Sequence, residues 1–242
     1  MKQYNTGTNF RYLDELPSIA LSEDQKNQLT QFSTFVLKWN QQLNLTAITD
    51  PKEFWIKHIY DSLTCLPLIC AGNDLSVIDI GTGAGFPGIP IKIAYPEIRL
   101  TLVESIKKKA DFCRRAVEEL GLLGVQVLAQ RAETIGQADQ HRARYDWAVA
   151  RAVAPLTVLV EYLLPLVPIG GCALAQKGGN AGEEISRARH AIQTLGGAID
   201  QVHDLELPED AGSRTLITIK KMRATPAKYP RRAGTPKKNP LV

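Results

Sequence analysis

The chain has 242 residues and a net charge of +4. Of its residues, 44% are hydrophobic and 22% are charged, which is the composition of an ordinary globular protein. Its four cysteines show no Cys-x-x-Cys spacing and no histidine cluster, so we expect no metal site, no disulfide framework, and a reducing, cytoplasmic compartment. The first ten residues are polar and the longest uncharged stretch, residues 162–176, spans 15 residues, which argues against a signal peptide and a membrane span.

The first 72 residues predict a helical appendage. Ser22 and Gln25 have the spacing of a capping box, and apolar residues then recur at intervals of three and four: Leu29, Phe32, Val36, Trp39 and Leu43. This amphipathic helix should end near Asn44. A second helical stretch begins at Asp50-Pro51 and runs through Leu66.

Residues 73–222 predict an α/β domain, because apolar strand-like runs alternate there with helical segments. The expected strands are 75–80, 99–103, 125–129, 145–150, 171–176, 199–207 and 214–220, and the expected helices are 88–95, 106–120, 155–167 and 181–195. Such alternation predicts a doubly wound, mostly parallel sheet of seven strands. Only residues 208–213 separate the last two strands, which should form an antiparallel hairpin. This order resembles the Rossmann-like fold of class I methyltransferases that use S-adenosylmethionine (AdoMet).

A glycine-rich turn follows the first expected strand, with the sequence Asp79-Ile80-Gly81-Thr82-Gly83-Ala84-Gly85-Phe86-Pro87-Gly88. Glycines permit positive φ and a close approach of backbone to ligand, which is typical of a site for a nucleoside cofactor. A dinucleotide-binding loop reads Gly-x-Gly-x-x-Gly, but Phe86 stands at its last small position. The spacing of Gly81, Gly83 and Gly85 instead resembles the first motif of AdoMet methyltransferases. The plainer alternative, a tight strand-to-helix turn, seldom needs four glycines in eight residues.

Two acidic residues accompany this turn. Glu104 ends the second strand, 25 positions after Asp79, where a carboxylate can accept hydrogen bonds from a ribose diol; a solvated strand-end charge is the alternative. Asp79 has two open roles, since it can bond the amides of the turn or reach the amino group of the cofactor.

Two further strand ends carry candidate contacts. Ala132 and Glu133 follow the third strand, where an adenine would lie against the backbone, although a loop with an incidental salt bridge explains them equally well. Arg151 follows the fourth strand, beside the expected reactive methyl group. Its guanidinium lies between apolar segments and should point at an acid or a phosphate, so we take Arg151 as the candidate catalytic residue; a surface arginine is the alternative.

Missing motifs narrow the methyl acceptor. An exocyclic amine usually calls for (Asn/Asp)-Pro-Pro-aromatic after the fourth strand, but the chain has Arg151-Ala152-Val153-Ala154 there. Methylation of a pyrimidine carbon needs a cysteine nucleophile, commonly after proline, and no cysteine of this chain follows a proline. A ring nitrogen such as guanine N7 carries no proton, so its methylation needs alignment and desolvation but no general base.

Other polar groups have structural and functional interpretations. His58, Asp61 and Ser62 share one helix face and should form a hydrogen-bond network that ties the appendage to the sheet domain; a catalytic or RNA-binding role is the alternative. A lysine run is usually a solvated face. Lys107-Lys108-Lys109 lies in the first turn of a helix, where the helix dipole disfavours cations, and contact with phosphate is the second interpretation.

The C-terminal part is basic. Residues 214–242 contain nine Lys or Arg and no acid, and four prolines follow Met222: Pro226, Pro230, Pro236 and Pro240. We expect residues 223–242 to form an extended, mobile tail without a helix or a core. It should serve RNA and not the cofactor.

Together these motifs resemble the glucose-inhibited-division-B family of bacterial 16S rRNA (guanine-N7) methyltransferases, over nearly the whole chain. The carriers are Trp39-Asn40, Asn44-Leu45-Thr46, His58 with Asp61-Ser62, residues 79–90, Val103-Glu104-Ser105 with Lys108-Lys109, Arg131-Ala132-Glu133 and Arg151-Ala152. The glycine-proline turn is the specific one, whereas residues 229–236 match only a subset of the family.

The resemblance implies the cofactor, the substrate and several site residues. AdoMet would be bound by Gly81, Phe86, Ala132, Glu133 and Arg151. The methyl acceptor would be a guanine in the decoding-region loop of 16S rRNA, numbered 527 in that RNA. The partner is then 16S rRNA or the small ribosomal subunit, and we expect the protein to act as a monomer.

Two rival functions come from other classes. A nicotinamide-dependent oxidoreductase is disfavoured by Phe86 and by the lack of a convincing Tyr-x-x-x-Lys motif or catalytic histidine pair near the strand ends. A non-catalytic RNA-binding protein with a relic AdoMet fold is disfavoured by the intact glycine turn.

Overall fold

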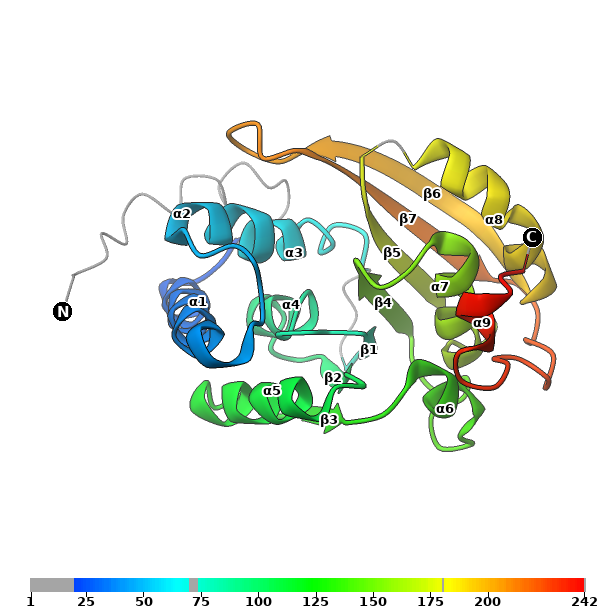
Figure 1. The fold of residues 1–242 in the computed structure, drawn as a ribbon, viewed down its shortest axis with the longest axis horizontal. Coiled ribbons are helices and arrows are strands. Elements are labelled where there is room, and N and C mark those ends of the chain that lie inside the picture. The colour runs from blue at the N-terminus through cyan, green and yellow to red at the C-terminus, as the bar shows by residue number, and fades with distance from the viewer. Residues whose placement is uncertain (1–19, 70–73, 180, 242) are drawn as a thin grey trace.

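The computed structural model describes residues 20–69, 74–179 and 181–241, and the fold is built around one seven-stranded sheet (Figure 1). The strand order is β3-β2-β1-β4-β5-β7-β6, and every neighbouring pair is parallel except the two that involve β7. The predicted doubly wound sheet with a closing antiparallel hairpin is therefore confirmed.

The strands lie close to their predicted positions. They are β1 (Ser76–Ile80), β2 (Arg99–Val103), β3 (Val125–Leu128), β4 (Trp147–Arg151), β5 (Cys172–Gly178), β6 (Gly197–Glu206) and β7 (Ser213–Lys221). The helices of the sheet domain are α4 (Gly88–Ala94), α5 (Lys107–Glu119), α6 (Ala132–Gln137), α7 (Leu156–Leu163) with a 3-10 turn η4 (Leu164–Leu166), and α8 (Gly182–Thr194). Of these, only α6 was not predicted, because six residues are too short to show a helical period.

Each face of the sheet has its own apolar core, because successive strand residues point to opposite faces. Val77 and Val149 pack with α4, α5 and the N-terminal helices on one face. Ile78 and Ala148 pack with α7 and α8 on the other. Burial on both faces is why the parallel strands read as continuous apolar runs in the sequence.

The N-terminal helix α1 (Glu23–Leu43) forms as predicted and packs on the first of these cores. Ser22 and Gln25 form the reciprocal capping box, and the Asn44 cap takes the left-handed conformation that ends the helix. Leu29, Phe32 and Val36 are fully buried. The amphipathic pattern thus becomes an apolar interface with α4 and α5.

The second helical stretch is irregular. It consists of α2 (Pro51–Phe54), a π-helical segment η3 (Trp55–Tyr60) and α3 (Asp61–Leu63). π-Helical segments are rare in proteins, and those that occur are often found at functional sites. The wider turn changes the direction in which the side chains point. The apolar period predicts the helix but not this widening. Residues 1–19 and 70–73 of the predicted appendage, with Cys70, lie outside the described residues.

The C-terminal segment corrects the expectation of an extended tail without a helix. Residues 235–238 form α9 (Thr235–Lys238), which lies beside α7 in Figure 1. Tyr229 is buried, and Arg231 forms an ion pair with the fully buried Glu161 of α7. Basic and proline-rich composition argues against packing, but this segment is fixed by polar contacts and by Tyr229 packed against distant residues, which composition does not show.

Three further findings concern the described residues. No helix among them is long and apolar enough to cross a membrane. They contain no His, Cys, Asp and Glu cluster arranged to hold a metal ion. Cys65 and Cys113 are buried free thiols, and Cys172 is buried as well.

Candidate active site

The glycine turn connects β1 to α4 at the carboxyl edge of the sheet, where open α/β sheets bind ligands. Gly81 has φ +70°, and a Cβ there would lie 2.7 Å from Cγ2 of Val153. Gly83 has φ +61° and has no heavy atom within 4 Å of where its Cβ would be, so the turn presents bare backbone to open space. Gly81, Gly83 and Phe86 line a cavity of about 520 Å³, which we call the Arg151 cavity.

Asp79 supports the turn from beneath. Its Oδ2 accepts hydrogen bonds from Oγ1 of Thr82 at 2.6 Å and from the amide of Gly88 at 2.9 Å. Burial is the main cause that raises the pKa of Asp79 to about 7. Of its two open roles, bonding the turn is the one the structure displays. Asp79 and Gly85 line neither cavity described here, and Gly85 turns the chain against Ile89.

Glu104 lies at the end of β2 and lines the Arg151 cavity. Its Oε2 accepts from the amide of Gly83 at 3.1 Å, and its Oε1 accepts from the amide of Ile106 at 2.8 Å. A carboxylate offers about four acceptor positions, so Glu104 keeps capacity for a hydroxyl donor in the cavity. The side chain is 6% exposed and fixed in direction, unlike a solvated strand-end charge.

Arg151 points at an acid, as predicted. Its Nη1 lies 3.1 Å from Oδ2 of Asp61, while Oδ1 of Asp61 accepts from Nε of Arg214 at 3.0 Å and from Nε2 of Gln176 at 2.7 Å. Burial raises the pKa of Asp61, and the two arginines oppose that shift. One carboxylate thus joins the N-terminal helices to the ends of β4, β5 and β7.

His58 completes this arrangement from the π-helical segment. Its Nδ1 lies 3.2 Å from Nη2 of Arg151 and its Nε2 lies 2.7 Å from Oγ1 of Thr46. Arginine can only donate, so Nδ1 accepts and Nε2 carries the proton. Burial first, then the charges of Arg151 and Arg214, lowers the pKa of His58 to about 3. The imidazole is therefore neutral at physiological pH.

Phe86 forms the floor of this region. The His58 ring stacks on it with centroids 4.9 Å apart and an angle of 16°, and Cζ of Arg151 lies 5.1 Å from its centroid. The predicted network between the appendage and the sheet domain is confirmed through His58 and Asp61. Ser62 instead donates to the carbonyl of His58 within its own helix.

A second cavity of about 250 Å³ adjoins the turn on its other side, and we call it the Glu133 cavity. Gly81 lines both cavities, and Ser105, Ala132, Glu133 and Tyr162 line the second. Oε1 of Glu133 accepts a hydrogen bond from the amide of Gly234 at 2.8 Å. An incidental surface salt bridge does not describe Glu133, which is 5% exposed.

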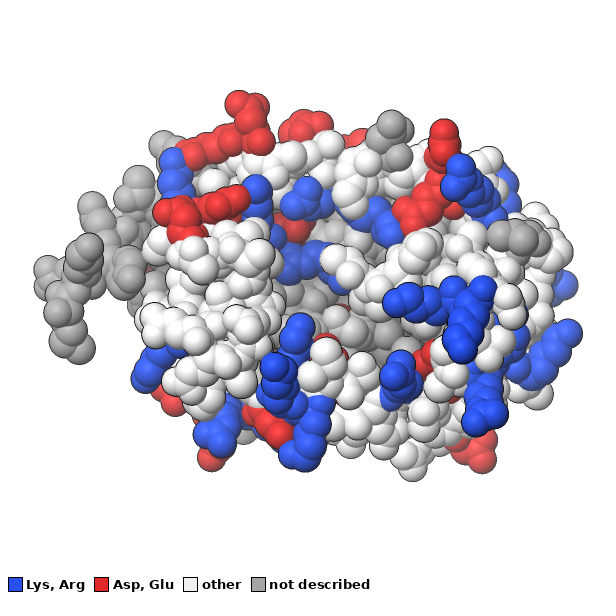
Figure 2. All heavy atoms as spheres, viewed as in Figure 1, with Lys and Arg blue, Asp and Glu red and all other residues white. Residues whose placement is uncertain are grey.

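Sequence reasoning missed several residues of the Arg151 cavity. Its cationic lining includes Lys57, Lys177 and Arg214, which the sequence did not single out, beside Arg151 and Lys109, which it did. Figure 2 shows Lys and Arg on both sides of a hollow in this face. Gln176 and Lys177 follow the strand-end rule that singled out Arg151, so that signal was available for them. From the lysine run, Lys109 lines the cavity and Lys107 pairs with Asp111.

The two cavities suit AdoMet. Gly83 has no Cβ, which leaves room for a ligand beside its backbone. Glu104 lines the same cavity and offers acceptor positions to a ribose. Ala132 and Glu133 border a pocket beyond Gly81 that can take an adenine. The residues of the two cavities, which share Gly81, therefore fit the cofactor along the strand ends.

The fold is that of class I AdoMet-dependent methyltransferases. Precorrin-6y C5,15-methyltransferase from Geobacter metallireducens GS-15 is similar with a TM-score of 0.51 and 15% identity, over 66% of this chain and 87% of that one. MtNAS, solved in complex with MTA and tNA, is similar with a TM-score of 0.55 and 16% identity, over 92% of each chain.

Sequence comparison gives the family. A family model described as GidB, rRNA small subunit methyltransferase G, matches residues 25–215. Ribosomal RNA small subunit methyltransferase G of Pelotomaculum thermopropionicum is 48% identical over 92% of this chain and 93% of its own length. The chain belongs to the rRNA small subunit methyltransferase G family, as its motifs indicated.

Proposed function

We propose that this protein transfers the methyl group of AdoMet to N7 of a guanine in 16S rRNA, as a monomer in the cytoplasm. The relatives' names support a ribosomal RNA of the small subunit as substrate. The guanine numbered 527 follows from the resemblance and not from any contact in the structure.

The observation that carries the choice of atom is the state of the acids and the imidazole in the Arg151 cavity. Among the described lining residues these are His58, Asp61 and Glu104, and each is already engaged. Asp61 holds two arginines, and both nitrogens of His58 have partners. Glu104 holds two backbone amides, and we assign its remaining acceptor positions to the ribose of AdoMet. An acceptor that has to lose a proton finds no available base here. Guanine N7 carries none, so it fits this cavity.

When bound, AdoMet supplies an electrophilic methyl group on a sulfonium sulfur. In the transfer, a bond forms between N7 and the methyl carbon while the sulfur–carbon bond breaks, which leaves S-adenosylhomocysteine and a cationic guanine ring. The protein's task is alignment. Arg151, held by Asp61, and the face of Phe86 border the reacting region, and Lys109 and Arg214 can hold phosphates of an unstacked nucleotide.

The cofactor-binding residues that we propose are Asp79, Gly81, Gly83, Gly85, Phe86, Glu104, Ala132, Glu133 and Arg151. Asp79 and Gly85 contribute by shaping the turn, since they do not line a cavity. Gly81, Gly83, Phe86, Glu104 and Arg151 border the Arg151 cavity, whereas Ala132 and Glu133 border the second.

N7 methylation has a chemical signature that tests the proposal. It opens the imidazole ring after borohydride and allows aniline to cleave the chain, which methylation at N1, N2 or a ribose oxygen does not. Purified protein with AdoMet should create one new cleavage site in 16S rRNA. Glu104→Ala should abolish or strongly reduce it, while Glu97→Ala, an exposed acid before the same strand, should not. Methyl label without cleavage would refute the N7 assignment and keep the methyltransferase activity.

A further inference from the structure

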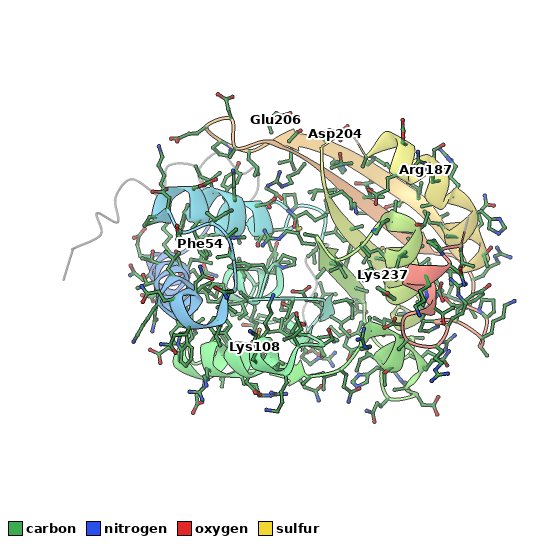
Figure 3. The ribbon with its side chains drawn as sticks, in the orientation of Figure 1. Phe54, Lys108, Arg187, Asp204, Glu206 and Lys237 are labelled. Atoms are coloured by element: carbon green, nitrogen blue, oxygen red, sulfur yellow. The ribbon has the colours of Figure 1, made fainter. Side chains whose placement is uncertain are left out.

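The C-terminal segment, residues 223–241, reaches the Glu133 cavity. Lys237 lines that cavity together with Gly81 and Glu133, although it is more than 100 positions away from both in sequence. Figure 3 shows Lys237 on α9, beside α7. The segment therefore contributes a cation to a cavity that fits the adenosine end of AdoMet.

A buried ion pair fixes the segment on α7. Nη2 of Arg231 lies 2.7 Å from Oε2 of Glu161, Nε lies 2.9 Å from Oε1, and the backbone amide of Arg231 donates to the same Oε1 at 2.7 Å. Glu161 is fully buried. Bidentate pairing with a carboxylate fixes both the position and the orientation of the arginine side chain. The chain therefore starts towards α9 from a fixed residue, Arg231.

Contacts with α6 and with the turn that follows it fix the same segment from the other side. Arg142 donates to the carbonyls of Thr225, Pro226 and Tyr229. Nε2 of Gln137 donates to the carbonyl of Pro230 at 2.7 Å. Pro230 packs so closely on Gly136 that a Cβ on this glycine would lie 2.7 Å from the proline ring. The path of the chain before α9 is thus determined by several independent contacts.

Glu133 connects the segment to the cavity wall. The same side chain lines the cavity and accepts the hydrogen bond of Gly234, three residues before Lys237. Lys237 is exposed like Lys228, Arg232 and Lys238, but those three residues line neither cavity. Position, and not charge alone, distinguishes Lys237 from them.

We propose that the C-terminal segment is a wall of the cofactor site and that Lys237 is a further AdoMet-binding residue. Its ammonium group donates to an acceptor at the adenosine end, a ring nitrogen or a ribose oxygen. This inference rests on AdoMet as the ligand of the proposed function. It replaces the expectation that the segment serves RNA and not the cofactor.

Two adjacent lysines provide the test. Lys237→Met keeps the aliphatic stem and removes the donor, and Lys238→Met is the matched control on the same helix. Loss of one such hydrogen bond should weaken AdoMet binding by about threefold to tenfold in calorimetry for Lys237→Met. Lys238→Met should bind AdoMet like the wild type. Unchanged melting temperatures without ligand would show that both variants are folded.

The outcomes separate this inference from the proposed function. If both variants bind AdoMet like the wild type, or both weaken equally, Lys237 is not a cofactor residue. If Lys237→Met lowers only the affinity for 16S rRNA, the segment serves RNA and the inference is overturned. Failure of the wild type itself to bind AdoMet would instead refute the proposed function. Glu104→Ala, at the other cavity, provides the reference for a weakened cofactor site.

Discussion

The N-terminal helix α1 and the C-terminal segment pack on opposite faces of the sheet, the first through apolar contacts and the second through many polar ones. The N-terminal helix α1 packs through buried Leu29, Phe32 and Val36. The C-terminal segment buries Tyr229 in the other core, but its path is held by one buried ion pair and by hydrogen bonds to backbone carbonyls. An apolar interface spreads its free energy over many small contacts, whereas a polar one depends on a few groups that are costly to leave unpaired.

The difference predicts where each region is vulnerable. The N-terminal helices that carry Asp61 are packed through buried apolar side chains. Loss of Asp61 therefore leaves the charges of Arg151 and Arg214 beside a core that does not open easily. The C-terminal segment can leave its place on α7 while the sheet stays folded. Substitutions at the two ends should therefore differ in size and in the kind of unfolding they cause.

The largest effect should come from Asp61→Ala, which leaves Arg151 and Arg214 without their carboxylate partner. Removing one member of a buried ion pair costs roughly 3–5 kcal/mol of unfolding free energy, because the remaining charge is uncompensated. Urea denaturation measures this. Glu183→Ala, which removes an exposed pair with Arg187, should stay near the wild type. Equal stabilities of the two variants would contradict the role given to Asp61.

Arg231→Ala should have a smaller and more local effect. It leaves Glu161 buried without its partner, a cost on the order of 1–3 kcal/mol, but release of the segment lets water reach the carboxylate and limits the loss. Limited proteolysis should cut residues 223–241 faster while the sheet domain remains protected. Arg232→Ala, an exposed neighbour, serves as control. A global loss of stability as large as that of Asp61→Ala would break the comparison.

The pH dependence at His58 should be smaller still. Its pKa is about 3 in the folded chain against 6.5 for an ordinary histidine, so on acidification below pH 6.5 the unfolded chain takes up a proton that the folded chain does not. Stability from this group is complete above pH 6.5 and is lost as pH falls towards 3.

Comparing the wild type with His58→Gln isolates this contribution from other titrating groups. The stability of the wild type relative to the variant should decrease by about 1–2 kcal/mol between pH 6.5 and pH 5. Urea denaturation of both proteins at several pH values gives the difference. A difference that stays constant over this range would mean that the pKa of His58 is the same in the folded and the unfolded chain.

The sequence predicted the parts of the structure that follow from local pattern. Period and spacing located every strand, the helix α1 and the glycine turn, because burial on each face dictates which residues are apolar. The direction of Arg151 towards an acid was also predicted, since a guanidinium between apolar segments needs a partner. All of these predictions depend only on residues that are close to one another in the sequence.

The parts that were missed depend on partners far apart in the sequence. Glu161 lies in an otherwise apolar helix, and its partner Arg231 follows 70 residues later in a stretch whose composition suggests no packing. The π-helical turn that directs His58 towards Arg151 leaves no trace in the apolar period. Spacing along the chain does not give the distance in space between such groups, so neither the docked segment nor the place of Lys237 at the Glu133 cavity was predicted.

Hydrogen exchange with and without AdoMet tests most directly whether both cavities belong to one cofactor site. A ligand at a hundred times its dissociation constant stabilises the state that binds it by about 2.7 kcal/mol. Amides that exchange only when the binding site opens should therefore exchange up to about a hundredfold more slowly. We predict slower exchange both in residues 81–88 and in residues 229–238, including the amide of Gly234, with no change at the tip of the β6–β7 hairpin. Slower exchange in the glycine turn alone, with residues 229–238 unaffected, would contradict the account.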